Sequence, residues 1–302
     1  MDGTLNIAAL AALTTALLWA ITPLISVAPA AQLGSVGFAR WRMYTAFAVL
    51  GVIVTLRGGW AGLPGSEMTT LALSGFVGIF LGDTLLFASM NILGPRRAAI
   101  LFASNAAIAA LLAVLFLGET VTFQLFVAFG AVTAGVMLAI FFGKARSNTH
   151  LWEMNRGSVM LGIGFGVVAA LCQATGSVLA KPVMDTGVEP MTASAFRLGA
   201  AAAAHTLFLW ILPRFARNSN ALDLKTFLQV CATSILSMVV GMTILMFALA
   251  KGDVSWVSIL SSISPILILP ILWIFFSKPP PLGAWVGAAL TICGTTLIIL
   301  NT

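Results

Sequence analysis

The chain alternates apolar runs with short polar joints along its whole length. About 20 predominantly apolar residues are enough for a helix to cross the hydrocarbon layer of a bilayer. Dividing the sequence at its charged and Gly/Pro-rich joints therefore predicts ten membrane-spanning helices, at residues 5–27, 36–56, 69–90, 97–117, 121–142, 157–181, 190–213, 225–249, 254–276 and 281–300. Because joints such as 118–120 and 251–253 are very short, the helices that they connect must be antiparallel neighbours.

A repeat relates the two halves of this pattern. The longest polar segment lies at the middle of the chain, with five predicted helices on each side. A shift of 159 positions aligns the halves without a gap and pairs several identical residues, namely Gly82 with Gly241, Thr84 with Thr243 and Gly135 with Gly294. A shift of 155 positions pairs Arg42 with Arg197. The sequence thus predicts one five-helix repeat at 1–142, a polar joint at 143–156 and a second repeat at 157–302.

An odd number of helices in each half has a consequence for topology. The second half must enter the membrane from the opposite face, so the predicted fold is an all-α polytopic membrane protein of two inverted five-helix repeats. Inverted repeats are typical of secondary transporters, whose substrate site lies near the midplane between the halves. The alternative is a duplicated helical bundle that carries no solute.

Composition agrees with a membrane protein and excludes other classes. The chain is 60% hydrophobic and 8% charged, with a mean hydropathy of +1.07, whereas a soluble domain is about 25% charged. The net charge of +6 comes from Lys and Arg scattered among the joints, so we expect a lipid bilayer and no nucleic acid as partner. Cys172, Cys231 and Cys293 each stand alone in an apolar run, so we interpret them as packing residues. The N-terminus lacks a basic segment, which predicts a retained first helix and no cleaved signal.

Three short motifs give the chain a family resemblance. They are ALLWAITPLIS at 16–26, RWRMY at 40–44 and LFLGETVTFQLFVAFGAVTAGVML at 115–138. With them the sequence resembles the ten-helix EamA-type members of the drug/metabolite transporter superfamily. The second half repeats the last motif at 264–298, but Lys278 stands where the first half has Glu119. The resemblance implies export or exchange of small metabolites, amino acids prominent among them, by alternating access in the bacterial inner membrane.

Three ionisable residues within the spans are candidates for coupling or gating: Asp83, Arg42 and Arg197. An ionisable side chain inside a span costs about 2.5–3.5 kcal/mol on insertion scales, so it normally faces a cavity or a partner. Asp83 has two interpretations, a carboxylate that titrates or binds an amine in the pathway, or the partner of an arginine such as Arg42 or Arg97. The equivalent Arg42 and Arg197 would form a gating ion pair or bind a carboxylate, unless they are interfacial anchors, as we expect for Arg40.

Polar uncharged residues supply the candidates for the substrate cavity. Asn105 and Ser264 are equivalent under the 159 shift, and Pro265 interrupts the helix next to Ser264. Freed backbone carbonyls at membrane depth occur only where they line protein or a cavity, so 102–105 and 261–265 are expected to line it. The full set of cavity candidates is Trp19, Asn105, Gln173, Thr175, Ser261 and Ser264. Trp19 would otherwise be a packing residue, and His205 is expected to be a hydrogen-bonded packing residue more than a proton relay.

Other chemistries lack their motifs. The sequence has no G-x-x-x-x-G-K-[ST] loop, HExxH or GxSxG, which argues against ATP as an energy source and against the corresponding hydrolases; no metal or cofactor is predicted. The first helix lacks the acidic residue with which small multidrug transporters of the superfamily bind cations. A channel-like pore, an intramembrane enzyme using Asp83 and a multidrug or other metabolite exporter remain the alternatives.

Orientation is the one feature on which two arguments disagree. The odd-numbered joints carry most of the basic residues, namely Arg96, Arg97, Lys144, Arg146, Arg156, Arg214, Arg217, Lys225 and Lys278, and the even joints carry Arg57, Lys181 and Lys251. The positive-inside rule then places both termini outside, whereas the resemblance implies both termini inside. Both arguments place the termini on one face. Ten spans with an internal repeat would suffice for a complete pathway in a monomer, and proton coupling is an open expectation.

Overall fold

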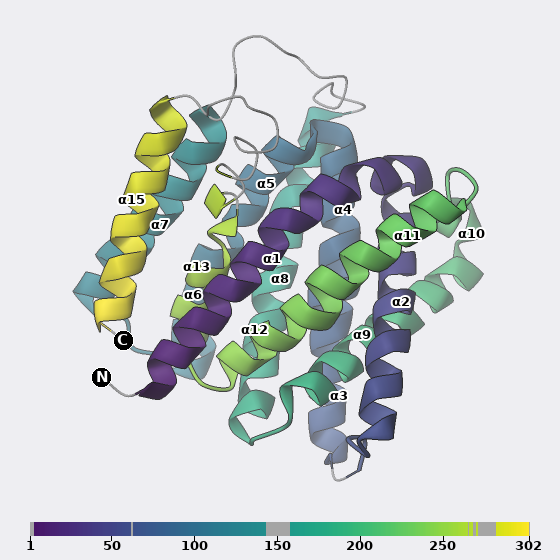
Figure 1. Ribbon diagram of the computed structural model, residues 1–302, viewed down its shortest axis with the longest axis horizontal. Helices are drawn as coiled ribbons and strands as arrows, with labels where there is room; N and C mark the ends of the chain where they lie inside the picture. The colour runs from purple at the N-terminus through teal and green to yellow at the C-terminus, as the bar shows by residue number, and fades with distance from the viewer. Residues whose placement is uncertain are drawn as a thin grey trace.

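Helices form all the secondary structure that the computed structural model describes, which covers residues 3–61, 63–142, 158–264 and 282–301, together with 266, 267 and 270 (Figure 1). Eight segments are long and apolar enough to cross a membrane: Asn6–Leu33, Ser35–Leu56, Gly65–Leu93, Arg97–Leu117, Val159–Asp185, Pro190–Ile211, Leu224–Leu249 and Leu282–Leu300. Phe123–Leu138 is a shorter apolar helix. The central joint at 143–156 and most of the predicted helix 254–276 beyond residue 264 lie outside the described residues.

The first two helices of each half lie at the predicted positions, with ends that differ from the prediction by up to six residues. The first half begins with α1 (Gly3–Leu33) and α2 (Ser35–Leu56), and the second begins with α8 (Val159–Asp185) and α9 (Pro190–Ile211). Helix α1 was expected to end at residue 27, but it continues through Pro23 and Pro29. Each proline removes one backbone hydrogen bond, while hydroxyls of the same turns add others: Thr22 donates to the Leu18 carbonyl and Ser26 to the Thr22 carbonyl, both at 2.9 Å.

The third helix of each half contains a π-helical stretch. In the first half α3 (Gly65–Gly75) leads into η1 (Phe76–Leu81) and then α4 (Gly82–Leu93). In the second half α11 (Leu224–Thr233) leads into η3 (Ser234–Gly241) and then α12 (Met242–Leu249). The 159 shift places η1 inside η3, so the distortion is itself repeated. Such π segments are rare and occur frequently at functional sites.

The fourth helix of each half is interrupted. In the first half α5 (Pro95–Ala103) and α6 (Asn105–Leu117) meet at a turn on Ser104. In the second half α13 (Val254–Ser261) ends in a turn at Ser262 and Ile263. These positions are equivalent under the 159 shift, so both halves have a discontinuity at the same place. The interruption at Ser262 and Ile263 directly precedes Ser264, while Pro265, at which the sequence predicts a break, lies outside the described residues.

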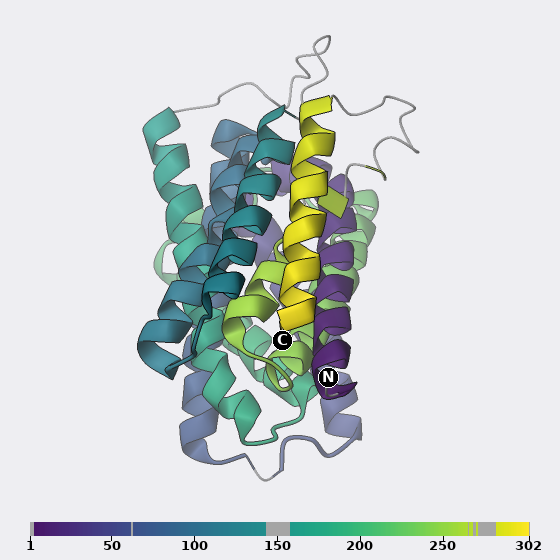
Figure 2. The same ribbon diagram turned by 90° about the vertical axis from the view of Figure 1, so that its left-hand side faces the viewer.

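The two halves are interleaved. Helices α4 and η1 of the first half pack on α8 of the second, and η3 and α12 of the second pack on α1 of the first. The fifth helices, α7 (Phe123–Phe142) and α15 (Leu282–Asn301), lie side by side at one edge of the molecule (Figure 1, Figure 2). The repeat-related Gly135 and Gly294 permit this contact: a Cβ on Gly135 would lie 2.6 Å from the Gly287 carbonyl, and one on Gly294 would lie 2.8 Å from the Ala128 carbonyl.

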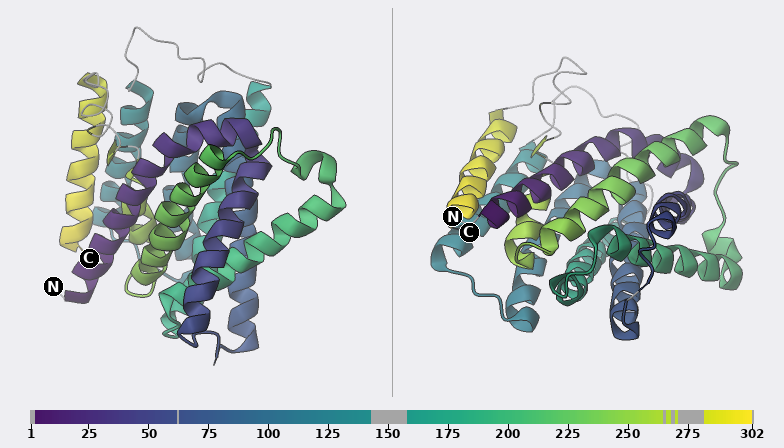
Figure 3. Two further views of the ribbon diagram at one scale, coloured as in Figure 1. Left: turned by 45° about the vertical axis from the view of Figure 1, so that its right-hand side comes forward. Right: turned by 60° about the horizontal axis from the view of Figure 1, so that its bottom comes forward.

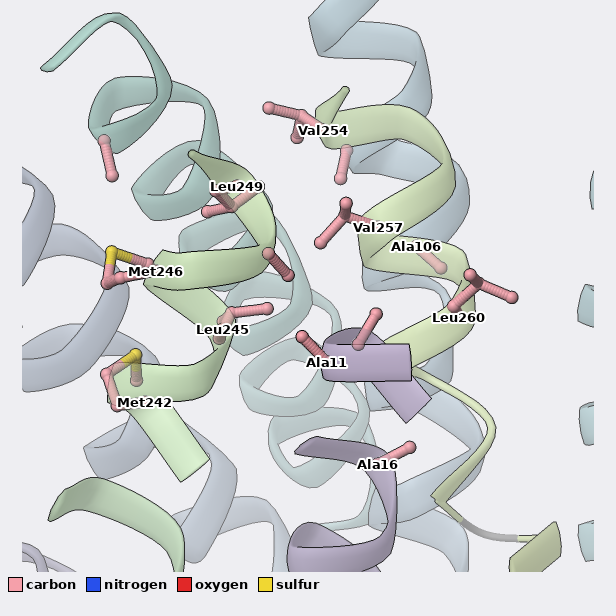
Figure 4. Packing of buried hydrophobic residues seen from close by; sticks show 14 of the residues in the cluster. Ala11, Ala16, Ala106, Met242, Leu245, Met246, Leu249, Val254, Val257 and Leu260 are labelled. Carbon is pink, nitrogen blue, oxygen red and sulfur yellow. The ribbon is translucent and has the colours of Figure 1, made fainter. Parts of the chain in front are cut away.

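Small residues fill the interior and large apolar residues face outward. Alanines of α1 and α6 pack against Leu245 and Leu249 of α12 and against α13 (Figure 4). Small residues let membrane helices approach closely. The exposed residues include Leu10, Leu56, Phe116, Phe126, Trp210 and Leu282, as expected for a surface solvated by lipid.

Both chain ends lie at the same end of the helix bundle, as the even number of spans predicts (Figure 1, Figure 3). We call it the terminal end, and the other the distal end. The joints of the terminal end carry acidic residues, among them Glu67, Glu119, Asp185, Glu189 and Asp253. The short α10 (Pro213–Ala216) and the residues around it, with Arg214 and Arg217, belong to the distal end. Among the described residues, Arg214 and Arg217 thus lie at the opposite end of the bundle from these acidic residues.

Candidate functional site

The Arg42 guanidinium joins three helices near the distal end. Its Nη1 donates to the Asp83 Oδ2 at 2.8 Å, and its Nη2 donates to the Ser237 hydroxyl at 2.6 Å. The side chains of Arg42 and Asp83 are 3% and 13% exposed. Arg42 comes from α2, Asp83 from α4 and Ser237 from η3, so this buried network ties the first half to the second.

Two phenylalanine rings enclose the same guanidinium. The Arg42 Cζ lies 5.5 Å from the centroid of Phe38 and 5.1 Å from that of Phe87. The two rings meet edge to face at 4.8 Å. At these distances the ring faces attract the cation. The structure thus pairs Asp83 with Arg42, and a titrating role for the same carboxylate stays a prediction.

Trp19 reaches the same η3 segment from α1. Its indole Nε1 donates to the Ser237 carbonyl at 3.2 Å. Gly241, at the end of η3, leaves room for the ring, since a Cβ there would lie 3.0 Å from Nε1. Ser237 thus accepts a hydrogen bond from Trp19 at its carbonyl and one from Arg42 at its hydroxyl. The sequence did not indicate this residue, because its repeat partner, Gly78, is a glycine.

Arg197 lies in the equivalent position of the second half, nearer the terminal end, and its side chain is 0% exposed. Its Nη1 is directed at two thioethers, Met242 Sδ at 3.1 Å and Met246 Sδ at 3.3 Å. Both methionines project from the same side of α12 (Figure 4). Sulfur is a weak acceptor, and the Nε and Nη2 atoms of Arg197 have no partner among the described residues.

The neighbours of the two arginines correspond one to one. The 159 shift pairs Asp83 with Met242 and Ser237 with Gly78. Gly78 does face Arg197, because a Cβ on it would lie 3.3 Å from Nη2. Each half therefore has a buried arginine enclosed by equivalent positions, which we call an arginine socket. In the second half, apolar residues stand in place of both polar partners.

The cavity candidates at the helix breaks make local hydrogen bonds. Asn105 Nδ2 donates to the Phe102 carbonyl at 2.6 Å, and the Ser261 hydroxyl donates to the Ser258 carbonyl at 3.0 Å. The Ser258 carbonyl also accepts the backbone N–H of Ser262 at 3.1 Å, where α13 ends. Ser264 is half-buried. That Asn105, Ser261 and Ser264 line a cavity stays a prediction.

The remaining cavity candidates lie on α8, where Gln173 is buried and Thr175 is half-buried. Both are next to the point at which α8 crosses η1, since a Cβ on Gly176 would lie 2.6 Å from the Gly78 Cα. Two surface hollows lie elsewhere, one on the outer face of α2 and one between the joints near Gly59 and Gly187. Neither hollow contains a candidate residue.

Two expectations for polar residues need correction. Arg40 was expected to be an interfacial anchor, but it is 5% exposed and donates to the Ala216 carbonyl and, at 2.7 Å, to the Asn218 side chain. His205 was expected to be a hydrogen-bonded packing residue. It is fully buried with its ring edge-on to Phe80 at 4.7 Å, and neither ring nitrogen has a partner in the part of the chain described.

Glu119, in the joint that carries the family resemblance, caps a helix of the opposite half. Its two carboxylate oxygens accept the backbone N–H groups of Val254 at 2.6 Å and Ser255 at 3.0 Å. A carboxylate at a helix N-terminus satisfies free donors and interacts favourably with the helix dipole. Lys278, at the equivalent position, lies outside the described residues.

The paired arginine sockets, the repeated π segments and the repeated breaks define an integral multi-pass membrane protein built as two inverted five-helix repeats. A comparison with known families finds the EamA-like transporter family, which matches residues 6–141 and again residues 160–300. The chain belongs to this family, a group of transporters of the drug/metabolite type, and the predicted fold class and family are thereby confirmed.

Comparisons with individual proteins support the fold and give no further information on function. A solved structure described as "Crystal structure of protein" is similar over 97% of this chain and 96% of its own, with a TM-score of 0.76 and 18% identity. No curated protein matches the sequence.

Proposed function

We propose that the protein is a secondary active transporter that exports or exchanges small metabolites, most specifically amino acids, by alternating access through a central cavity between the repeats 1–142 and 157–302. One observation carries the proposal. The π segments η1 and η3 and the breaks at Ser104 and Ser262 recur at equivalent places in both halves. Discontinuous helices at the interface of inverted repeats form the substrate and ion sites of many transporters.

The two arginine sockets supply the gates in this proposal. The Arg42–Asp83–Ser237 network closes the distal end, because it joins α2 and α4 to η3 of the other half. At the terminal end, a Cβ on Gly75 would lie 2.1 Å from the Arg197 carbonyl oxygen, so α3 and α9 touch backbone to backbone. Alternating access would separate one of these contacts while the other holds.

Asp83 is the proposed coupling group. Its carboxylate lies in a span, bound to an arginine of the first gate, so protonation would release Arg42 and open the distal end. If it titrates during transport, Asp83→Asn should abolish the pH dependence of flux in a folded protein. Unchanged pH dependence would leave Asp83 with a structural role only. The pairing also speaks against an intramembrane enzyme, since the carboxylate is engaged by Arg42.

Counterflow in proteoliposomes tests the transport function itself. Protein reconstituted as a monomer into vesicles preloaded with amino acids should accumulate labelled amino acid with saturable kinetics. A pore would give no saturable counterflow. Absence of counterflow with amino acids, nucleosides and organic cations would overturn the proposal. Reporter fusions to the C-terminus would establish which end of the bundle faces the cytoplasm in the proposed location, the bacterial inner membrane.

A further inference from the structure

One face of α9 carries buried polar groups with atoms that lack a hydrogen-bond partner among the described residues. Ser194, Arg197, Ala201 and His205 follow one another at helical spacing, and each is 0% exposed. The Ser194 hydroxyl, Arg197 Nε and Nη2, and both ring nitrogens of His205 have no hydrogen-bond partner among the described residues. Unpaired polar groups in a membrane interior are costly and normally mark a site or a pathway.

The equivalent face of α2 shows that this arrangement is particular to the second half. The 155 shift pairs the four positions with Ala39, Arg42, Ala46 and Leu50. Only Arg42 is polar there. Its Nη1 and Nη2 donate to Asp83 and Ser237, while its Nε, like that of Arg197, has no partner among the described residues. The first half therefore has an ion pair where the second half, among the described residues, has a cation without a counter-charge beside a hydroxyl and an imidazole that lack hydrogen-bond partners.

The chemistry of Arg197 specifies what would complete it. A guanidinium keeps its charge in proteins, and a buried charge needs a counter-charge. Nη1 is directed at the sulfurs of Met242 and Met246. The open atoms, Nε and Nη2, form one edge of the planar fork, and two parallel N–H groups on such an edge match the two oxygens of a carboxylate.

We propose that this edge of Arg197, with the Ser194 hydroxyl one helical turn away, binds the carboxylate group of the transported substrate. This assignment rests on the proposed transport function and deepens it. Gly78 leaves no side chain over Nη2, but its approach to Gly176 closes the site in the present conformation. The carboxylate enters when η1 moves away from α8 and α9, that is, when the terminal end opens.

A carboxylate supplied by the protein itself gives the sharpest test. Met242→Asp places a carboxylate at the position of the second half that is equivalent to Asp83. The new carboxylate should pair with Arg197, as Asp83 pairs with Arg42, and thereby compete with the carboxylate of the substrate. Met242→Leu, which keeps volume and apolarity, is the matched control. Arg197→Met removes the cation, and its side chain would fit beside Met242 and Met246. If this variant fails to fold, the comparison of Met242→Asp with Met242→Leu decides the question alone.

The measurement is the melting temperature of the purified full-length protein, titrated with amino acids and with the corresponding amino amides, such as phenylalanine against phenylalaninamide. Wild type and Met242→Leu should be stabilised by acids and not by amides. Met242→Asp should bind the acids about ten- to a hundredfold more weakly, as expected for the loss of a charge-assisted hydrogen-bonded pair.

Four results would overturn the assignment: no shift with any acid, equal shifts with amides, equal shifts with chloride or phosphate, or an unchanged affinity in Met242→Asp. The failure of the proposed function looks different. If wild type binds acids but shows no counterflow of any solute, transport is refuted while the carboxylate site stands. If counterflow continues in Met242→Asp with unaltered affinity, transport stands and the site is refuted.

Discussion

The Arg42–Asp83 pair allows a quantitative prediction, because both partners are buried and their contacts are known. Asp83→Asn keeps the size of the side chain and removes its charge. Arg42 then retains the Ser237 hydroxyl and the faces of Phe38 and Phe87. Breaking a buried ion pair by removing one partner costs about 3–5 kcal/mol, and the surviving cation–π contacts favour the lower end, about 3 kcal/mol.

A double-mutant cycle measures this coupling. The variants are Asp83→Asn, Arg42→Met and the double substitution, and melting temperature in detergent is the assay. At about 2 °C per kcal/mol for a chain of this size, Asp83→Asn should melt about 6 °C below wild type. The double variant should recover part of that loss, because it leaves no buried charge unpaired.

Ser237→Ala is the control within the same network. It removes one hydrogen bond to a charged group and should cost about 1.5–3 kcal/mol, without altering the coupling between Arg42 and Asp83. If the single substitutions are additive to within about 0.5 kcal/mol, the pair contributes nothing specific and the proposed distal gate is refuted.

Three further predictions concern other contacts. Glu119→Ala should cost about 1–3 kcal/mol by leaving the first N–H groups of α13 unpaired, with Glu119→Gln losing less; a melting curve that matches wild type would contradict the cap. Gly135→Ala should destabilise by about 1–3 kcal/mol through overpacking, because its Cβ would lie 2.3 Å from the Thr291 hydroxyl, whereas Gly130→Ala in the same helix meets no atom within 4 Å and should not lower the melting temperature. Asp223, at the N-terminus of α11, accepts hydrogen bonds from the side chain and the backbone of Thr226, and these hold its pKa below the ordinary 3.8. The stabilisation of α11 by the Asp223 carboxylate should be complete above pH 3.8 and should disappear as the pH falls through the lowered pKa. Hydrogen exchange at the start of α11, compared between wild type and Asp223→Asn, should show this loss.

Much of the fold follows from the sequence, because the bilayer requires long apolar helices and an odd count per half requires inversion. The equivalence of Arg42 and Arg197 was also visible, since both are rare charges at related depths. Helix ends were less predictable. Helix α1 continues beyond its predicted end at residue 27 and through Pro29, and whether a helix continues past a proline at membrane depth depends on tertiary contacts with neighbouring helices.

The partners of the candidate residues were not predictable. Ser237 reaches Arg42 only because η3 lies against α2, and a hydroxyl in an apolar run gives no sign of what it will face. The π segments themselves leave no residue signature in FVGIFL or SILSMVVG. Glu119 was known to be unmatched in the second half, but the helix that it caps is 135 positions away, and no local pattern connects the two.

The interleaving of the halves determines the order in which the protein can be completed during synthesis. Chains fold from the N-terminus as they are made, and the Arg42–Asp83 pair is available once three membrane-spanning helices have been inserted. The donors that Glu119 caps and the carbonyl that Trp19 binds belong to helices that emerge much later. The first five helices must therefore remain in the membrane with the surface that contacts α8 uncovered. An insertion chaperone, or a premature pairing of two such first halves, would at this stage determine the yield of folded protein.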